Sequence, residues 1–408
     1  MVRTRDEHEG GSKMWMRVGA LIVLIASLAA PALGGDAALV SVLQTTLEAY
    51  LSARGAKEHI SAASLSISFR GDPANVNVAA GRTRYAGEGV PATASNLYQI
   101  GSNTKAFTAV TILQLEAAGT LNIAQTLGHW LPEYPSWEQV TIRRLLNMTS
   151  GIPDYDDAPF FLTAVASRPN RLWTPAQLIA FVDPVYGHAL PPTRGWSYSN
   201  TNYLLAQLII ERATGHSYAE EITRRFLAGN LGLRQTYYQA DTYPKSVTSR
   251  MVSGYFFRPG LAELRPLLGR DVKDAGVSWA QGAGGMVSTP EDLVRWARAL
   301  YEGDMLAPAQ RRELMSIVSQ KTGTPIATTT RQNPRGFGLA VAQGTSPALG
   351  TFWFYEGETF GYRTLYAWLP KSDAVIAIGL NSSPSETEDH IARLLDSVYS
   401  VLHRRGKL

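Results

Sequence analysis

Cysteine is absent from the 408-residue chain, and so are several well-known enzyme signatures. Without cysteine the protein forms no disulfides, binds no zinc through thiolates, and has neither a cysteine nucleophile nor a lipid-modified cysteine as an anchor. The sequence also lacks the G-x-S-x-G elbow, the H-E-x-x-H zinc helix and the G-x-x-x-x-G-K phosphate loop. The enzyme classes that depend on these motifs lose their main support, and we expect neither a metal ion nor an organic cofactor.

Charged residues make up only 18% of the chain, and they form no extended basic pattern. The formal net charge is +4, and the only dense basic cluster is the tail with Arg404, Arg405 and Lys407. Nucleic-acid-binding proteins concentrate their cations in a stripe or patch, so we expect no nucleic-acid partner. The apolar content of 45% is typical of a folded globular protein, and the length predicts two lobes.

The N-terminal segment has the order of a secretory signal. Lys13 and Arg17 precede an apolar run over residues 18–33. Small residues lie at the end of this run and directly after it. This order predicts a signal peptide over residues 1–34 and an exported protein, either periplasmic or secreted. Met14 opens a more conventional signal and is an alternative start. An uncleaved membrane anchor is the alternative to cleavage, although the run is shorter than the ~20 residues that span a bilayer.

Hydrophobic periodicity predicts a helical segment enclosed by strand-rich ends. The expected strands cover residues 64–69, 76–80, 97–100, 351–355, 362–368 and 374–380. The expected helices cover residues 37–54, 104–118, 174–182, 203–213, 219–227 and 386–402. We therefore predict an α/β lobe built by residues 36–115 and 281–408, with a mostly helical lobe over residues 116–280 inserted between them.

The first candidate for catalysis is the pattern Ser102-x-x-Lys105 at the start of an apolar helix. Side chains three positions apart share a helix face, so these two can form a hydrogen bond. Burial and the positive end of the helix dipole both disfavour the charged amine and lower the pKa of Lys105 toward that of a useful base. A surface lysine after a capping serine is the simpler alternative. A serine–histidine triad also stays open, because triads are recognised by geometry and not by spacing.

A second candidate lies in the loop around Tyr198 and Asn200. In an extended segment, residues two apart point the same way, so both side chains can enter one cleft. A phenol close to Lys105 could pass a proton to a leaving group, and the Asn200 amide could hold a substrate amide or orient the lysine. The alternative is a turn in which Asn200 caps the following helix.

The third candidate is a late strand that continues as Tyr355-Glu356-Gly357-Glu358. A glycine inside a strand weakens it unless something must come close to the backbone. At Gly357 that neighbour would be a substrate carbonyl, bound by a strand amide and by the amide of Ser102 as an oxyanion hole. A bulge or turn between two strands is the alternative explanation of the glycine.

Together and in this order, the three motifs resemble those of the penicillin-binding proteins and class C β-lactamases, with relatives among D,D-carboxypeptidases, D-aminopeptidases and esterases. The stretches 145–155, 284–293 and 335–339 also resemble sequences frequent in these hydrolases. The resemblance implies a mainly antiparallel sheet flanked by helices, and hydrolysis through an acyl-enzyme. The catalytic residues that it implies are Ser102, Lys105 and Tyr198. The substrate-binding residues that we expect are Asn200, Tyr355, Gly357 and Glu358.

The sequence departs from this family at Tyr355, where relatives usually carry lysine or histidine. Tyrosine keeps a hydroxyl donor but supplies no cation for a substrate carboxylate at neutral pH. Arg363 could replace the missing charge, whereas Glu356 and Glu358 make the strand acidic. We expect an exported serine hydrolase of esters or amides, of the esterase, D-amino-acid peptidase or D,D-carboxypeptidase type, with a small molecule or a peptide such as a peptidoglycan peptide as substrate. A β-lactamase, or a penicillin-binding sensor that is acylated without turnover, is the alternative.

Overall fold

The computed structural model describes residues 37–85, 88–186, 190 and 192–408 of the chain. These residues belong to one compact unit. The predicted signal peptide over residues 1–34, and its alternative as an uncleaved anchor, lie outside the described residues. Within the described residues, no helix is both long and apolar enough to cross a membrane.

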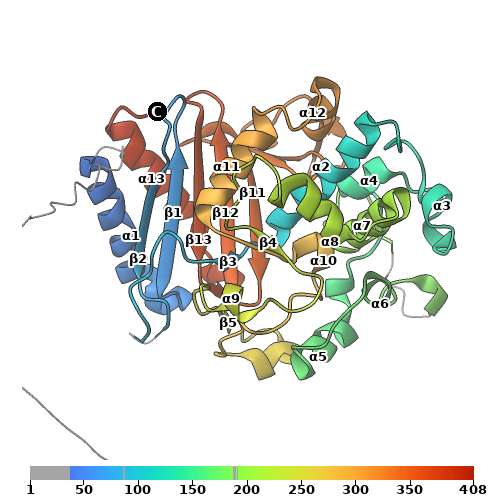
Figure 1. The fold of residues 1–408 in the computed structure, drawn as a ribbon, viewed down its shortest axis with the longest axis horizontal. Coiled ribbons are helices and arrows are strands. Elements are labelled where there is room, and N and C mark those ends of the chain that lie inside the picture. The colour runs from blue at the N-terminus through green and yellow to red at the C-terminus, as the bar shows by residue number, and fades with distance from the viewer. Residues whose placement is uncertain (1–36, 86–87, 187–189, 191) are drawn as a thin grey trace, which may run out of the picture. The chain divides into compact units, whose positions relative to one another are not determined.

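A nine-stranded antiparallel sheet runs through the described part of the chain (Figure 1). From one edge to the other, its strands are β2 (Val76–Gly81), β1 (Ala62–Ser68), β13 (Ala374–Leu380), β12 (Tyr362–Leu369), β11 (Gly350–Thr359), β10 (Ala342–Ser346), β9 (Arg335–Phe337), β7 (Ile317–Ser319) and β8 (Pro325–Ile326). β1 pairs with β2 on one side and with β13 on the other, so both ends of the chain build one sheet. This arrangement confirms the predicted fold class.

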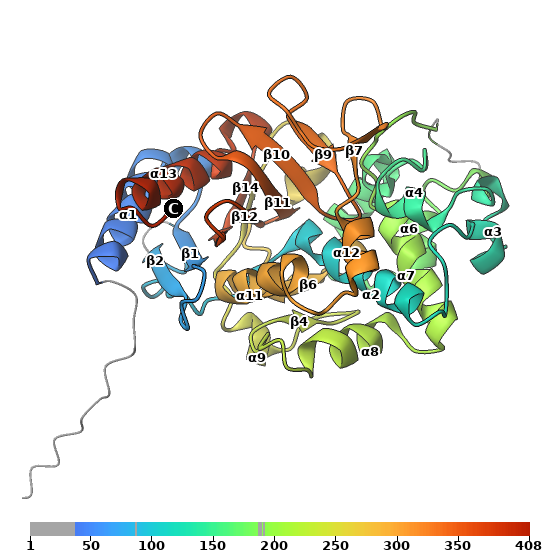
Figure 2. The same ribbon diagram turned by 90° about the horizontal axis from the view of Figure 1, so that it is seen from above.

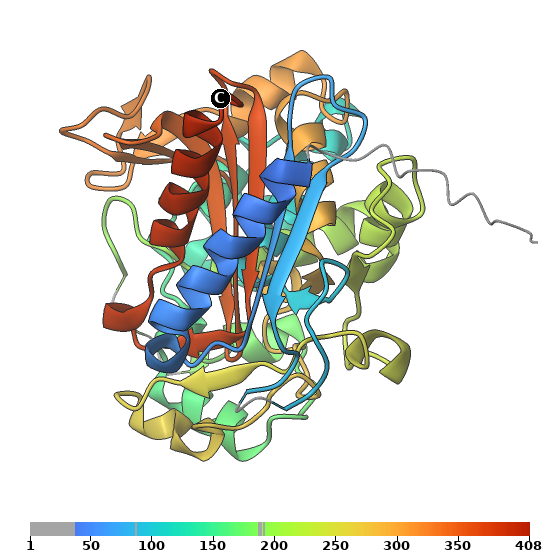
Figure 3. The same ribbon diagram turned by 90° about the vertical axis from the view of Figure 1, so that its left-hand side faces the viewer.

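Helices cover both faces of this sheet. α1 (Ala37–Glu58) and α13 (Ile391–Arg404) lie side by side on one face, as Figure 3 shows. α11 (Pro290–Tyr301) packs on the opposite face against β1, β12 and β13 (Figure 2). The apolar residues of α11 and α13 recur at helical spacing, which gives each helix one apolar side to bury against the strands.

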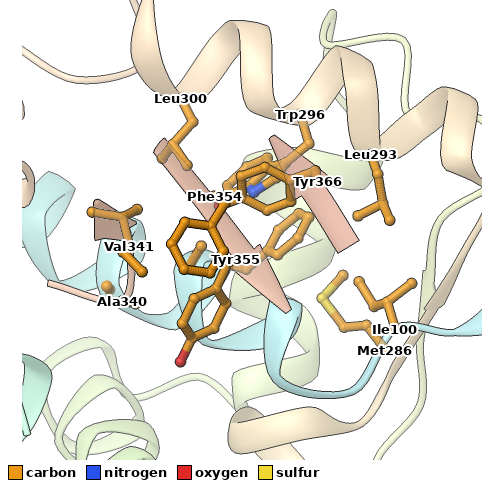
Figure 4. Close-up of a cluster of buried hydrophobic side chains, with 14 of the residues drawn as sticks. Ile100, Met286, Leu293, Trp296, Leu300, Ala340, Val341, Phe354, Tyr355 and Tyr366 are labelled. Carbon is orange, nitrogen blue, oxygen red and sulfur yellow. The ribbon is translucent and has the colours of Figure 1, made fainter. Parts of the chain in front are cut away.

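The core between α11 and the sheet contains large aromatic side chains (Figure 4). Trp296 and Leu300 project from α11 toward Phe354 of β11 and Tyr366 of β12, and all four are buried. Burial of side chains of this size contributes roughly 1.5–3 kcal/mol each to stability. The middle of the sheet, which carries β11, therefore rests on a well-packed layer.

Several helices differ from their predicted bounds, and single side chains explain the differences at α1 and α13. α1 continues past Gly55, where a cap was expected, to Glu58, because the Glu58 carboxylate is buried and bound by the Arg363 guanidinium at 2.9 Å. Helix α13 begins at Ile391 and not at residue 386. The Asp389 carboxylate accepts a hydrogen bond from the Ile391 amide, so this side chain starts the helix later than periodicity indicated.

The remaining elements fill the space beside the sheet (Figures 1 and 2). The helices are α2 (Thr104–Ala117), α3 (Leu127–Trp130), α4 (Ile142–Leu146), α5 (Pro159–Ser167), α6 (Pro175–Ile179), α7 (Thr201–Thr214), α8 (Tyr218–Ile222), α9 (Lys245–Thr248), α10 (Gln281–Gly284) and α12 (Pro308–Leu314). Two small sheets contain β3 (Tyr98–Gln99), β6 (Met286–Ser288) and β4 (Tyr237–Tyr238), and β14 (Ser382–Pro384) with β5 (Tyr255–Phe257). The division into lobes at residues 116 and 280 stays a prediction.

Candidate active site

Two glycines bring the turn that carries Ser102 against β11. The turn is the 3-10 segment η1 (Gly101–Asn103), which leads directly into α2. Gly101 has φ +49°, and a Cβ there would lie 2.5 Å from the backbone nitrogen and oxygen of Glu358. A Cβ on Gly357 would lie 1.8 Å from the carbonyl oxygen of Ile100. The close neighbour that Gly357 requires is therefore the η1 turn of the protein itself.

We expect that replacing Gly357 with alanine destabilises the protein, because the added methyl group collides with backbone that cannot rotate away. Overpacking of a tight site lowers the free energy of unfolding by roughly 1–3 kcal/mol, which denaturant titration measures. Gly260→Ala is the matched control, since no atom lies within 4 Å of a Cβ there. Equal stability of the two variants would contradict the close approach of η1 and β11.

Lys105 lies in the first turn of α2 and is fully buried. Its Nζ is 3.0 Å from Ser102 Oγ, 2.5 Å from Asn200 Oδ1 and 2.7 Å from the Ala283 carbonyl oxygen. Burial lowers the pKa of Lys105 to about 7, and the carboxylates of Asp154 and Asp156 oppose that shift. A neutral amine donates two hydrogen bonds and accepts one. It therefore fits this site by donating to the amide and carbonyl oxygens and accepting from the hydroxyl of Ser102.

The loop before α7 delivers Tyr198 to the same hydroxyl. The phenol oxygen of Tyr198 lies 2.5 Å from Ser102 Oγ, and Lys105 Nζ lies 4.8 Å from the centre of the phenol ring. The loop is held by a hydrogen bond from the Ser197 amide to the Met148 carbonyl oxygen, at 2.9 Å. Burial raises the pKa of Tyr198 above its ordinary value, so the phenol is protonated at neutral pH. Tyr198 can thus give a proton to an atom near Ser102.

Asn200 occupies the cap position of α7, but its side chain makes no capping hydrogen bond. Its Nδ2 donates to Asp154 Oδ2 at 3.1 Å and to Asp156 Oδ2 at 2.9 Å, which turns Oδ1 toward Lys105. The geometry favours orientation of the lysine by Asn200 over the helix cap, and a contact of Asn200 with a substrate amide stays a prediction. The sequence indicated no role for the two aspartates, although Asp154 lies in the family-like stretch 145–155. Burial raises the pKa of Asp154 to about 6 and that of Asp156 well above its usual range.

We expect kcat/KM to rise with pH through about 7, because a base whose pKa is about 7 is active only when neutral. Asp154→Asn removes a negative charge that raises the pKa of Lys105. The acid limb of the pH profile should therefore move to lower pH, by about one unit. Asp157→Asn is the control, since Asp157 is exposed and is not among the groups that shift Lys105. A limb that moves upward in Asp154→Asn would contradict the assignment.

A cavity of about 600 Å³ opens beside the three polar groups. Ser102, Tyr198, Asn200, Gly357 and Glu358 all line it, and no histidine among the described residues does. Its far wall is apolar and comes from α5, the 3-10 segment η6 (Ala262–Leu267) and neighbouring loops. The large side chains of this wall are Phe161, Leu162, Phe256, Leu264, Trp279 and Phe360. The cavity therefore combines one reactive edge with an apolar wall.

One edge of β11 is open where it borders this cavity. β10 pairs with residues 350–354 of β11, whereas β12 pairs with residues 353–359. Among the described residues, no strand pairs with residues 355–359 on the β10 side. An extended peptide can add to such an edge through main-chain hydrogen bonds.

Tyr355 and Arg363 supply no free cation at the cavity, although the Tyr355 side chain interacts with that of Tyr198. Tyr355 is 4% exposed, packs against the ring of Phe337 and does not line the cavity. Figure 4 shows its ring in the core cluster with the hydroxyl at the margin, and this oxygen has no hydrogen-bond partner among the described residues. Arg363 is 2% exposed and is neutralised by Glu58 and Asp389, so it does not replace the missing cation. The substrate-binding role of Tyr355 stays a prediction.

Comparison with known proteins places this geometry in a family. A model of the Beta-lactamase family matches residues 47–399. Penicillin-binding protein 4* of Bacillus subtilis (strain 168) is 29% identical over 317 residues, which cover 76% of this chain but only 66% of that longer relative. Among solved structures, a D-stereospecific amidohydrolase from Streptomyces sp. has a TM-score of 0.69 at 26% identity, covering 85% of this chain and 95% of that one.

A D-amino acid amidase from Ochrobactrum anthropi SV3 shares the fold, with a TM-score of 0.74 at 24% identity and coverage of 90% of this chain and 99% of that chain. The family match spans most of the described chain and includes all three motifs that the sequence indicated. The resemblance inferred from these motifs is thereby confirmed. The chain belongs to the β-lactamase family, a group of serine hydrolases that is related to the penicillin-binding proteins.

Proposed function

We propose that this protein hydrolyses an ester or amide through an acyl-enzyme on Ser102, with Lys105 as base and Tyr198 as proton shuttle. The observation that carries the proposal is the meeting of three polar atoms. Ser102 Oγ lies 3.0 Å from Lys105 Nζ and 2.5 Å from the Tyr198 hydroxyl, at the edge of a cavity that a substrate can enter. A nucleophile within hydrogen-bond reach of a base that is itself oriented by a third group is the arrangement of covalent catalysis.

The proposed reaction has two halves, acylation of Ser102 and hydrolysis of the acyl-enzyme. Neutral Lys105 takes the proton of Ser102 while Oγ forms a bond to the substrate carbonyl carbon. Tyr198 then protonates the leaving alcohol or amine as the carbonyl–heteroatom bond breaks, and the proton on Lys105 restores the phenol. In the second half, a water molecule gives its proton to Lys105 and Tyr198 and attacks the acyl carbon. The bond between that carbon and Ser102 Oγ then breaks, which releases the acid, and the proton returns to Ser102.

The backbone amides of Ser102 and Glu358 are the proposed donors to the oxyanion of the tetrahedral intermediate. The closeness of Gly101 to the Glu358 backbone supports this pairing, because Ser102 follows Gly101 directly. Loss of one such donor typically costs about 3–4 kcal/mol of transition-state stabilisation. Since both donors belong to the backbone, they depend on the glycines at 101 and 357 and not on any side chain that points into the cavity.

We propose an acyl group bound in an extended form along residues 355–359 of β11, with an apolar part against the aromatic wall. The open strand edge and the wall support a peptide-like amide or ester. The likeness to a D-stereospecific amidohydrolase adds support for an amide of a D-amino acid. Esterase and D-amino-acid peptidase activities come first. D,D-carboxypeptidase and β-lactamase activities rank below them, because their substrates carry a carboxylate and Tyr355 supplies no cation to bind it.

Steady-state and burst kinetics with three substrates test the proposal: a short p-nitrophenyl ester, a D-Ala-D-Ala peptide and a cephalosporin. We expect turnover of the ester or of an amide, with a burst of leaving group that equals the enzyme concentration wherever deacylation is slow. A burst without turnover for all three would favour a sensor. No burst and no turnover would contradict the proposal. Export is a separate proposal, and the mass of the mature N-terminus tests it.

A further inference from the structure

We propose that Glu358 makes the site selective against substrates that carry a carboxylate near the reacting carbonyl. Glu358 forms an ion pair with Arg258, the arginine of the cavity that could otherwise bind such a carboxylate. The inference rests on the proposed function and adds a specificity determinant to it. Glu358 lines the cavity at the end of β11, and its carboxylate pairs with the Arg258 guanidinium. It also accepts a hydrogen bond from Ser383 Oγ at 2.6 Å.

Arg258 is held in place by contacts of its Nε and Nη2 atoms. Its Nη2 donates to Glu358, and its Nε donates to Ser383 Oγ at 3.1 Å and to the Pro384 carbonyl oxygen at 3.0 Å. A guanidinium binds carboxylates through a planar fork of N–H donors, and a fork already bound to one carboxylate offers little to a second. A substrate carboxylate would have to compete with Glu358 for Arg258.

The other cation of the lining is also neutralised. Arg363 donates to Glu58 Oε2 at 2.9 Å, to Asp389 Oδ1 at 2.5 Å and to the Ser382 carbonyl oxygen at 2.9 Å. Among the described residues, Arg258 and Arg363 are the only basic side chains that line the cavity. The position of the usual family cation holds Tyr355, which is neutral. Both arginines of the lining are therefore already paired within the protein.

The lining has an excess of carboxyl groups over these two arginines. The carboxyl groups of the lining are Asp156, Asp157, Glu356, Glu358 and Asp389. Glu356 and Asp157 are exposed and line the cavity. Loss of solvent around its carboxyl group raises the pKa of Glu356, and the Arg335 guanidinium, which lies outside the lining above the ring of Phe354, opposes that shift. A carboxylate that enters meets the negative charge of the groups that stay ionised, which disfavours it, whereas neutral esters and amides meet no such penalty.

Replacing Glu358 should weaken the preference for neutral substrates over carboxylate substrates. In Glu358→Gln the carboxylate that holds Arg258 is gone, but the backbone amide proposed for the oxyanion hole is kept. The freed guanidinium then faces the cavity and can bind a substrate carboxylate with two parallel hydrogen bonds. The variant should gain activity on carboxylate substrates more than it changes activity on neutral ones.

The test uses two thioesters that differ in one group: benzoyl-D-alanyl mercaptoacetic acid and benzoyl-D-alanyl mercaptoacetamide. For the wild type we expect kcat/KM for the amide to exceed that for the acid about tenfold or more. In Glu358→Gln this ratio should fall about tenfold. Glu356→Gln is the matched control, since it removes one charge from the same strand without freeing Arg258, and its ratio should change about threefold at most.

The double variant Arg258→Gln, Glu358→Gln lacks both the carboxylate and the freed arginine, so it separates the effect of the arginine from that of the lost negative charge. We expect its ratio of kcat/KM for the amide to kcat/KM for the acid to return toward the ratio of Glu356→Gln. Thermal unfolding and the rate on the amide report whether each variant is folded, and Glu358→Ala serves where glutamine disturbs folding. A wild-type ratio near one, equal shifts in Glu358→Gln and Glu356→Gln, or a gain that survives loss of Arg258 would overturn the inference. Hydrolysis of neither thioester, together with no covalent labelling of Ser102, would instead reject the proposed function.

Discussion

Ser102→Ala should lower kcat for ester or amide hydrolysis by about three to six orders of magnitude. The Ser102 hydroxyl is the only nucleophilic oxygen within 3.0 Å of Lys105 Nζ among the contacts of the described chain, and Tyr198 lies on its other side. Without Oγ no acyl-enzyme forms, so the burst of leaving group should also vanish. The backbone amides of the oxyanion hole remain, which leaves a small residual rate above that of water.

Ser95→Ala is the control for this variant. Ser95 is exposed and lies in the segment before the same turn, and its hydroxyl contacts only Thr93. Surface substitutions of this kind change stability by about 0.5 kcal/mol or less, so activity should stay within about twofold. A Ser102→Ala protein that keeps its fold and more than a tenth of the wild-type rate would exclude Ser102 as nucleophile.

Lys105→Met should lower kcat by about two to four orders of magnitude, the usual contribution of a general base. Methionine has nearly the volume of the lysine stem and tolerates the apolar surroundings of α2, so the helix should keep its packing. The loss should be accompanied by loss of the pH limb near 7, because the group that titrates there is gone. The pH profile of kcat/KM measures both effects.

The Lys105→Arg variant tests whether residue 105 acts as a base or only as a positive charge. Arginine keeps the charge and several donors but stays protonated at every accessible pH, so it cannot take the proton of Ser102. We expect this variant to be at least as inactive as Lys105→Met. If Lys105→Arg retained most of the activity, the amine would be acting as a fixed cation, and the role of general base would be wrong.

The motifs that lie close together in the sequence allowed the centre of the site to be predicted. Ser102 and Lys105 are three positions apart, and local helix geometry alone brings their side chains together. Tyr198 and Asn200 are two apart in one loop, so they were expected to enter the same cleft, and both line the cavity. The strands at both ends of the chain were also predictable, because strand alternation is a local signal, whereas their antiparallel arrangement was implied by the family resemblance.

Other features depend on contacts between distant segments and carry no local signal. The Arg258–Glu358 ion pair joins residues 100 positions apart, and neither residue lies in a pattern that marks the other. The same holds for Glu58, whose buried ion pair with Arg363 extends α1 by one turn beyond Gly55. A sequence pattern indicates which side chains can share a face, but it does not tell which charge on another element will neutralise them.

Covalent labelling with a fluorophosphonate, followed by mass mapping of the peptides, tests the central claim most directly. The claim is that the Ser102 hydroxyl is activated by Lys105 and Tyr198 at the mouth of the cavity. We predict one adduct per chain, located on Ser102, that forms faster as the pH rises through about 7 and is absent from Ser102→Ala. An adduct on another residue, or labelling that persists unchanged in Ser102→Ala, would contradict the account.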